Sequence, residues 1–387
     1  MKITFSNKAF SRVLGTLIFL FVISLTNNFG QINSRTEINI PDIPGYRTLK
    51  CDFHSHTVFS DGEVWPTVRI EEAWQQGLDA IALTDHIEYQ VHQADLPKNH
   101  NRPFEIASAR AEELGIILIK GAEITREMPP GHFNALFLQD INPLDTKDWR
   151  VALRAANAQG AFVFWNHPGW RQPNEIPIWY NEHTELLQQG LFQGLEIVNE
   201  YSFYPLALQW ALEKKLTILG NSDVHDPIYS TYDQTRGQHR PLTLVFAKGK
   251  SAAAIQEALR AHRTAVYHQN LLIGDALYLQ PIFEQALDML NPTVTIVGTG
   301  RALIQVRNRS DLPIELEFSL TSEEISIPAS VSIPGNRIVA LAIRSKSKSL
   351  SGNKSMVIPA MVRNFMTAPD QGLPVALKVE INFIPGK

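Results

Sequence analysis

The sequence predicts an α/β fold, a closed or nearly closed barrel of βα units, followed by a small all-β sandwich. From residue 48 to about residue 276, short apolar runs alternate with helix-like segments, as expected of repeated βα units. The apolar runs are nearly continuous, which is typical of strands buried on both faces of a parallel barrel. After about Met289 the runs alternate with polar residues and are broken by turns, which indicates a sandwich.

The barrel region contains eight expected strands and four clear helical segments. The strands, in chain order, are Leu49–Phe53, Ala80–Leu83, Ile116–Ile119, Ala135–Leu138, Ala161–Trp165, Gly194–Val198, Leu216–Leu219 and Leu242–Phe246. The helices are Val68–Gln76, Phe104–Leu114, Thr146–Ala158 and Ser251–Ala261, and the last has Ala and Leu at helical spacing.

The second region is shorter and contains no histidine, whereas all twelve histidines lie between His54 and His268. Its expected strands are Thr293–Val297, Ala302–Val306, Ile314–Ser319, Arg337–Ile343 and Leu377–Phe383, with an exposed loop over Ser345–Lys354. At 387 residues the chain is longer than one typical domain. We therefore expect a lead-in over 31–47, a barrel domain over 48–288 and a sandwich over 289–387.

The N-terminus has the pattern of a secretory signal peptide, expected over residues 1–30. Lys2, Lys8 and Arg12 precede an apolar run over 13–25, and no acidic residue comes before Glu37. A bilayer-spanning helix needs roughly 20 apolar residues, so a permanent membrane anchor is the less favoured alternative. The prediction is an exported protein, periplasmic or secreted.

Composition restricts the partners and the chemistry. The formal net charge of -4 shows no basic excess, which argues against a nucleic-acid surface and favours a small-molecule substrate. Cys51 is the single cysteine, so an intramolecular disulfide is excluded, and we expect a buried small apolar side chain there.

The motif CDFHSHTVFSDG carries two histidines two residues apart. Because side chains alternate across a strand, His54 and His56 point to one side and can bind one metal ion together. The pair alone is a weak signal, since a surface strand also reads H-x-H.

Further metal-ligand types follow the other expected strands, at the end of the barrel where active sites form. With the first pair they make nine candidates: His54, His56, Asp61, His86, Glu123, His132, His167, Asp223 and His225. Imidazoles and carboxylates without thiolates fit Mn, Zn or Fe, and nine donors exceed the needs of one tetrahedral ion. We expect two or three divalent metal ions per chain, with Glu123 able to bridge two of them.

The ordered set HSHTVFSDG, LTDH, KGAEIT, GHF, NHP and NSDVH, spanning roughly residues 50 to 270, resembles the PHP superfamily, named for polymerase and histidinol phosphatase. Residues 258–267 and the added β-domain resemble its secreted phosphodiesterase branch. The resemblance implies a distorted (β/α)7 TIM-like barrel and a trinuclear centre.

Carried onto this sequence, the resemblance assigns ligands to three metal positions. The first would use His54, His56, Glu123 and Asp223, the second Glu123, His132 and His167, and the third Asp61, His86 and His225. His132 follows Glu123 by only nine residues, closer than the equivalent spacing in some relatives.

Three further residues are candidates for supporting the metal ions or for binding the substrate. Asp85 precedes His86, so it would either bind metal or accept a hydrogen bond from a coordinated imidazole. Arg171 and Arg240 would clamp phosphate oxygens, with an ordinary surface arginine as the alternative. The histidines outside every motif, His92, His100, His183, His262 and His268, are expected on the solvated surface.

The functional hypothesis is a metal-dependent phosphoesterase, most specifically a phosphodiesterase. A metal-bridging hydroxide would attack the phosphoester in line, and a metal-bound water or a histidine would protonate the leaving oxygen. The catalytic assignments are Glu123, Asp223, His225, Asp85, Arg171 and Arg240. The alternatives are a carboxylic or carbamic ester hydrolase, a phosphomonoesterase with the same site, and a non-enzymatic metal-binding or ligand-binding protein.

Overall fold

The computed structural model describes residues 34–233 and 236–387. The expected signal peptide lies outside the described residues. Within them, no helix has the length and apolar character needed to cross a membrane.

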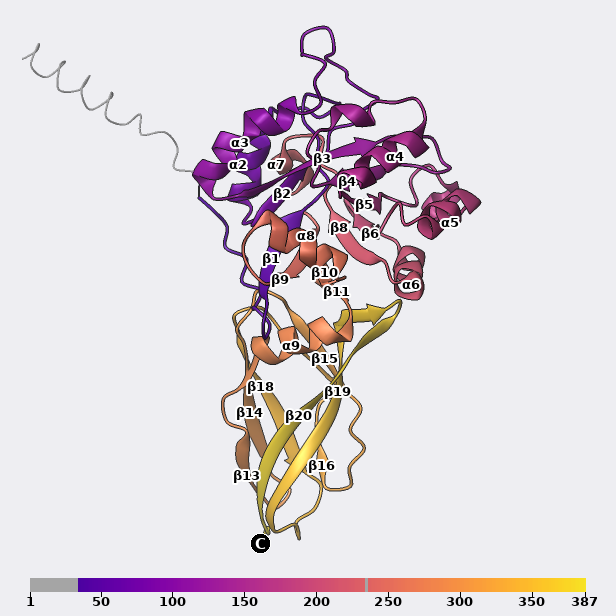
Figure 1. Ribbon diagram of the computed structural model, residues 1–387. Coiled ribbons are helices and arrows are strands. Elements are labelled where there is room, and N and C mark those ends of the chain that lie inside the picture. The colour runs from indigo at the N-terminus through magenta and orange to yellow at the C-terminus, as the bar shows by residue number, and fades with distance from the viewer. Residues whose placement is uncertain (1–33, 234–235) are drawn as a thin grey trace, which may run out of the picture. The chain divides into compact units, whose positions relative to one another are not determined.

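The first region alternates strands and helices, as its apolar runs predict (Figure 1). Its strands are β1 (Arg47–Asp52), β2 (Ala80–Leu83), β3 (Ile117–Ile124), β4 (Phe133–Leu136), β5 (Phe162–Trp165), β6 (Gly194–Asn199), β7 (Ser202–Phe203), β8 (Thr217–Asn221), β9 (Leu242–Ala247), β10 (Thr264–His268) and β11 (Leu271–Gly274). Its helices are α2 (Pro66–Gln75), α3 (Arg102–Leu114), α4 (Trp149–Ala158), α5 (Asn181–Gln188), α6 (Pro205–Lys214), α7 (Ile228–Thr231), α8 (Ala252–Arg260) and α9 (Ala276–Ala286), with short 3-10 turns at Asn142–Leu144 and Pro173–Glu175.

The sheet of this region is rich in parallel pairs but is not fully parallel. β1 with β2, β2 with β3, β5 with β6 and β6 with β8 are parallel. β4 runs antiparallel to β3 and β5, and β9 runs antiparallel to β1. The expected parallel direction is therefore not met at β4 and β9. β4 follows β3 after only eight residues, a connection too short for the crossover that a parallel neighbour requires.

The strands are buried as their composition predicts. Every residue of β2, β5, β6 and β9 is buried. Cys51 is fully buried in an apolar cluster with Phe53 and Phe164, which confirms the expected small apolar role. Near-continuous apolar runs thus correspond to strands covered on both faces.

Hydrogen bonds join the residues that follow β1 to the last residue of β8 and to the residues after it. The amide of Phe53 donates to Asn221 Oδ1 at 2.9 Å, the amide of Asp223 to the His54 carbonyl at 2.9 Å, and the amide of His56 to the Val224 carbonyl at 3.0 Å. The first and the last ligand motifs of the sequence therefore meet at one end of the sheet.

The second region is all-β, which confirms the predicted fold class. Its strands are β12 (Leu287–Met289), β13 (Thr293–Val297), β14 (Arg301–Asn308), β15 (Ile314–Phe318), β16 (Ile325–Ser326), β17 (Ser330–Ile333), β18 (Ile338–Ser345), β19 (Gly352–Ala368) and β20 (Gln371–Ile384). One sheet has the order β12-β14-β18-β16, and the other contains β13, β20, β19, β15 and β17.

The long hairpin β19–β20, yellow in Figure 1, was only partly predicted. Pro359 lies inside β19 and Pro374 inside β20, and proline argues against a strand because it cannot donate to the ladder. β19 also pairs in parallel with β11 through Leu272 and Ile273. Strands of the first region and of the all-β region therefore belong to one hydrogen-bonded sheet.

Candidate metal centre

The structure brings all nine predicted ligands to one end of the barrel sheet. Their donor atoms form three overlapping groups, each compact enough to hold an ion. The groups are His54, His56, Glu123 and Asp223; His86, Glu123 and His132; and His56, Asp61, His86 and His225. His167 joins them from the end of β5, with Nε2 at 3.4 Å from Glu123 Oε1.

The first group has the residues predicted for the first metal position. The Nε2 atoms of His54 and His56 each lie 3.0 Å from Asp223 Oδ1. The same two atoms lie 3.2 and 3.3 Å from Glu123 Oε2. Two imidazoles and two carboxylates thus point at one small volume, with both histidines and Glu123 fully buried.

Glu123 lies between the groups, and its two carboxylate oxygens face different imidazoles. Oε1 lies 2.8 Å from His132 Nδ1, whereas Oε2 lies 3.0 Å from His86 Nδ1. This placement suits a bridging carboxylate. It also brings His86 beside the predicted second metal position. The resemblance to the PHP superfamily had assigned only Glu123, His132 and His167 to that position.

The third group is more open than the first. Asp61 Oδ1 lies 3.3 Å from His225 Nε2, 3.5 Å from His86 Nε2 and 3.9 Å from His56 Nδ1. The Asp61 and His225 side chains are 25% and 32% exposed, so this position is the one that solvent reaches.

The buried donors fit divalent cations. His56 Nε2, Asp61 Oδ1, His167 Nδ1 and Asp223 Oδ1 are buried, and despite their close neighbours none of them makes a hydrogen bond of normal geometry. Buried polar atoms without a partner are costly and rare, and each of these lone pairs is of a kind that Mn, Zn or Fe accepts.

The electrostatics of the centre also favour positive charge. Burial opposes ionisation of Glu123, yet the neighbouring His86 and His54 hold its pKa well below the usual range. Burial would lower the pKa of His54, but Asp223, Glu196 and Glu123 raise it well above its ordinary value. The carboxylates therefore stay ionised and attract cations at neutral pH.

Two of the ligands have a left-handed backbone conformation. His167 and Asp223 have φ values of 23° and 50°, in a region that side-chain-bearing residues seldom adopt and that recurs at functional sites. Gly62 makes close approach possible in the first motif, because a Cβ there would lie 2.7 Å from the His56 carbonyl carbon.

Sequence reasoning missed Glu196, which supports the centre from β6. Its Oε1 lies 3.0 Å from His54 Nδ1, and its Oε2 accepts from the His167 amide at 2.7 Å. Asn166 was also missed, and its side-chain amide donates to Glu123 Oε1 at 2.9 Å. The available signal was a single charged residue inside the buried strand GLEIVN.

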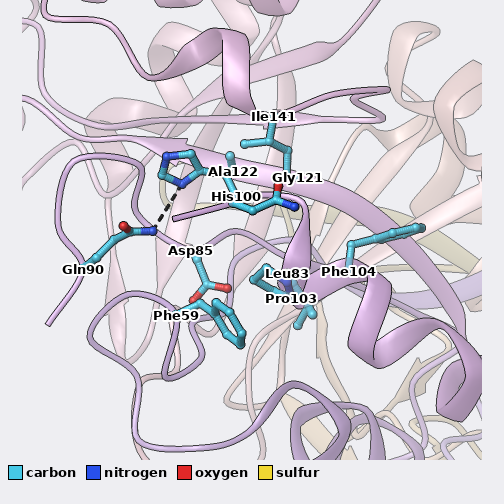
Figure 2. Close-up of a pocket in the computed structure, with 11 residues that line it drawn as sticks. Phe59, Leu83, Asp85, Gln90, His100, Pro103, Phe104, Gly121, Ala122 and Ile141 are labelled. Carbon is cyan, nitrogen blue, oxygen red and sulfur yellow. Dashed lines mark hydrogen bonds between the residues drawn. The ribbon is translucent and has the colours of Figure 1, made fainter. Parts of the chain in front are cut away.

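Asp85 lies behind the ligands rather than among them. Its Oδ1 accepts from the Thr57 amide at 2.7 Å and from Ser60 Oγ at 2.8 Å, and Ser60 Oγ lies 3.3 Å from His56 Nδ1. Figure 2 shows Asp85 beside a small pocket that Phe59 and His100 also line. Asp85 thus reaches a ligand imidazole only through Ser60, and it belongs to none of the three groups.

A cleft of about 680 Å³ opens beside the second and third groups. It is lined by Asp61, His86, Glu88, Tyr89, Thr125, Arg126, Glu127, His132, Trp170 and Arg171. Arg171 has an exposed side chain, stacks on Trp170 and lies 3.0 Å from Glu127. Arg171 therefore lines the cleft beside the donor groups, and its role as a phosphate clamp stays a prediction.

Arg240 does not line this cleft, so its predicted role as a phosphate clamp is wrong. Its side chain is 1% exposed, with Nη1 at 2.9 Å from Asp52 Oδ2 and Nε at 2.8 Å from Gln76 Oε1. These partners already hold the guanidinium in the interior. Three of the expected surface histidines, His100, His183 and His268, are buried as well.

Comparisons with known proteins agree with this architecture. Residues 52–190 match the model of the PHP domain, and residues 287–378 match that of an Ig-like domain. A crystal structure from Bacteroides vulgatus, of a two-domain protein containing a predicted PHP-like metal-dependent phosphoesterase, has a TM-score of 0.85 and 44% identity. That alignment covers 90% of this chain and 100% of the other.

Two curated proteins match shorter segments. An uncharacterised protein of Methanocaldococcus jannaschii is 37% identical over 87 residues, and a 5′-3′ exoribonuclease of Haemophilus influenzae is 35% identical over 78 residues. The two alignments span 21% and 20% of this chain, and they cover 36% and 24% of the two relatives, well short of their full length. On the full-length match and the two domain models, the chain belongs to the PHP-like metal-dependent phosphoesterases that carry a second, Ig-like domain at the C-terminus.

Proposed function

We propose that this protein is a phosphodiesterase that hydrolyses a small phosphoester at a centre of two or three divalent metal ions. The observation that carries the proposal is the set of three overlapping donor groups beside an open cleft of about 680 Å³. Asp61, His86 and His132 belong both to the donor groups and to the cleft wall, so a phosphoryl group in the cleft lies next to the ligands.

Divalent cations in such a site lower the pKa of bound water and neutralise charge on phosphoryl oxygens. The chain supplies the framework for this chemistry. Glu123 and Asp223 provide fixed negative charge, Glu196 and Asn166 orient His54 and Glu123, and burial keeps water away from the first group. No serine or cysteine nucleophile is required.

The charges around the cleft support a diester rather than a monoester. Arg126 is paired with Glu88, and Arg171 with Glu127, so each cleft arginine is already compensated. A phosphodiester carries one negative charge, whereas a monoester carries nearly two at neutral pH. The cleft wall thus offers no uncompensated arginine to the second charge, and its open side leaves space for the second ester substituent.

The test compares three esters on one protein preparation. After removal of metal by a chelator and add-back of Mn, Zn or Fe, we expect bis-p-nitrophenyl phosphate to be cleaved faster than p-nitrophenyl phosphate and p-nitrophenyl acetate. Asp223→Asn should lower the diester rate by about 10³-fold, since one carboxylate of the first group is lost.

Asp370→Asn, in the turn between β19 and β20, is the matched control because Asp370 belongs neither to the donor groups nor to the cleft wall, and it should keep full activity. A faster rate on the acetate would favour the carboxylic ester hydrolase, and a faster rate on the monoester would favour the phosphomonoesterase. Metal binding without turnover of any ester would overturn an enzymatic role.

We also propose that the mature protein is exported, on the basis of the basic and then apolar N-terminal sequence. Cell fractionation followed by N-terminal sequencing checks this proposal. A mature N-terminus near residue 31 in the periplasm or the medium is expected, and an intact Met1 in the cytoplasm would contradict it.

A further inference from the structure

Arg69 is a fully buried arginine on α2 that contacts the backbone of two ligand loops. Its Nε and Nη2 donate to the His56 carbonyl at 3.1 and 2.9 Å. Nη2 also donates to the His225 carbonyl at 2.9 Å, and Nη1 donates to the Asp226 carbonyl at 3.1 Å.

Glu72, one turn further along α2, completes the arrangement. Its Oε2 accepts from Arg69 Nη1 at 2.6 Å, and its Oε1 accepts from the Ile228 amide at 2.9 Å. Arg69 therefore makes five hydrogen bonds, as many as the N–H donors that a guanidinium carries in its rigid fork. Lysine cannot reproduce this pattern, because its three donors radiate from one nitrogen.

Arg69 donates to the carbonyls of two histidines that belong to the first and the last ligand motif of the sequence. His56 follows β1, and His225 follows β8, yet their rings stack with centroids 4.1 Å apart and planes 14° from parallel. Both belong to the donor group of His56, Asp61, His86 and His225. This group is the most exposed of the three, so packing alone constrains it least.

We propose that Arg69 is a positioning residue that fixes the separation of His56 and His225 and so determines whether the third metal position is occupied. The inference rests on the proposed metal centre. It adds that this position depends on α2 through a single guanidinium. The first position shares His56, but it is also held by His54, by Asp223 and by the buried Glu123 and Glu196.

The test uses the full-length protein and measures metal binding directly. Purified apoprotein is titrated with Mn²⁺, with bound ions counted by elemental analysis and free Mn²⁺ followed by EPR. We expect Arg69→Lys to lose one equivalent, or to bind its weakest equivalent at least 10-fold less tightly, while the remaining equivalents stay within twofold of the wild type.

The matched control is Arg263→Lys, a second buried arginine that donates to the Phe246 carbonyl and pairs with Glu257 instead of a ligand loop. Arg263→Lys should keep all equivalents, even if its melting temperature falls as much as that of Arg69→Lys. A merely structural role for Arg69 would give both variants the same binding isotherm.

If Arg69→Lys does not fold, Glu72→Gln tests the same arrangement, since it keeps the carbonyl contacts and weakens their anchor. A smaller loss of affinity at the same equivalent is then expected. Unchanged binding in either folded variant, or a uniform loss across all equivalents, would overturn the inference while leaving the phosphoesterase proposal intact. A wild-type protein that binds no Mn²⁺ would overturn both.

Discussion

His54 lies between two carboxylates on opposite sides of its ring, with Nδ1 at 3.0 Å from Glu196 Oε1 and Nε2 at 3.0 Å from Asp223 Oδ1. A carboxylate behind a ligand imidazole fixes the tautomer and raises the basicity of the ligand nitrogen.

We therefore expect Glu196→Gln to weaken the tightest metal equivalent by about 10 to 100-fold. The amide keeps the shape but loses the charge behind His54. Competitive titration against a chromophoric chelator measures the effect, and the exposed Glu213→Gln on α6 is the control. Equal affinities for the two variants would contradict the role assigned to Glu196.

Glu196 also shows the limit of motif reasoning. The nine predicted ligands sit in short ordered motifs whose residue types reveal metal binding, whereas Glu196 lies alone in an apolar strand. Its partners His54 and Asn221 are far away in sequence, so only the closed sheet identifies it. Apolar runs likewise predicted the buried strands but not their direction, which depends on the length of each connection.

His183 was misplaced for a related reason. It belongs to no ligand motif and was therefore expected on the surface, yet its ring stacks on Trp165 at 3.8 Å and its Nε2 lies 2.8 Å from the Pro130 carbonyl. Burial in this contact cannot be read from local sequence.

The burial of His183 predicts a pH-dependent stability. Burial lowers its pKa from 6.5 to about 4, so the unfolded chain takes up a proton at higher pH than the folded one. The stabilising contribution is complete above pH 6.5 and is lost as pH falls toward 4, by about 3 kcal/mol in total.

Thermal unfolding of the metal-free protein between pH 7.5 and 4.5 checks this prediction. His183→Gln should flatten the fall in melting temperature with decreasing pH, because no group at that position takes up the proton. His92→Gln, at an exposed position, should follow the wild type. Parallel curves for wild type and His183→Gln would contradict the assignment.

Arg240 is expected to affect stability rather than substrate binding. Its partner Asp52 is fully buried and also accepts from Ser222 Oγ at 2.5 Å. Arg240→Leu leaves that carboxylate uncompensated and should lower the free energy of unfolding by about 3 to 5 kcal/mol. Urea unfolding measures the loss.

A double variant separates the two roles of Arg240. Asp52→Asn combined with Arg240→Leu removes the uncompensated charge and should recover part of the lost free energy. The KM of the folded enzyme for the diester should stay within about twofold of the wild type. A tenfold rise in KM without loss of stability would restore the phosphate clamp that the sequence suggested.

Arg171 gives the contrasting expectation, because its side chain is 60% exposed on the cleft wall and its pairing with Glu127 is solvated. Exposed pairs contribute little to stability, so Arg171→Ala should leave the melting temperature unchanged. Loss of a cation beside the substrate should instead raise KM for the diester about threefold to tenfold with a smaller change in kcat.

Ionic strength tests whether this effect is electrostatic. Screening increases as the Debye length falls from about 10 Å at 0.1 M salt to about 3 Å at 1 M, so the difference in KM between Arg171→Ala and wild type should shrink at high salt. Glu127→Gln, which frees Arg171 from its partner, should lower KM in the same assay and lose that advantage in salt. Because these two variants change the same charge pair in opposite directions, a shift of KM in the same direction for both would show that Arg171 acts through packing on Trp170 and not through its charge.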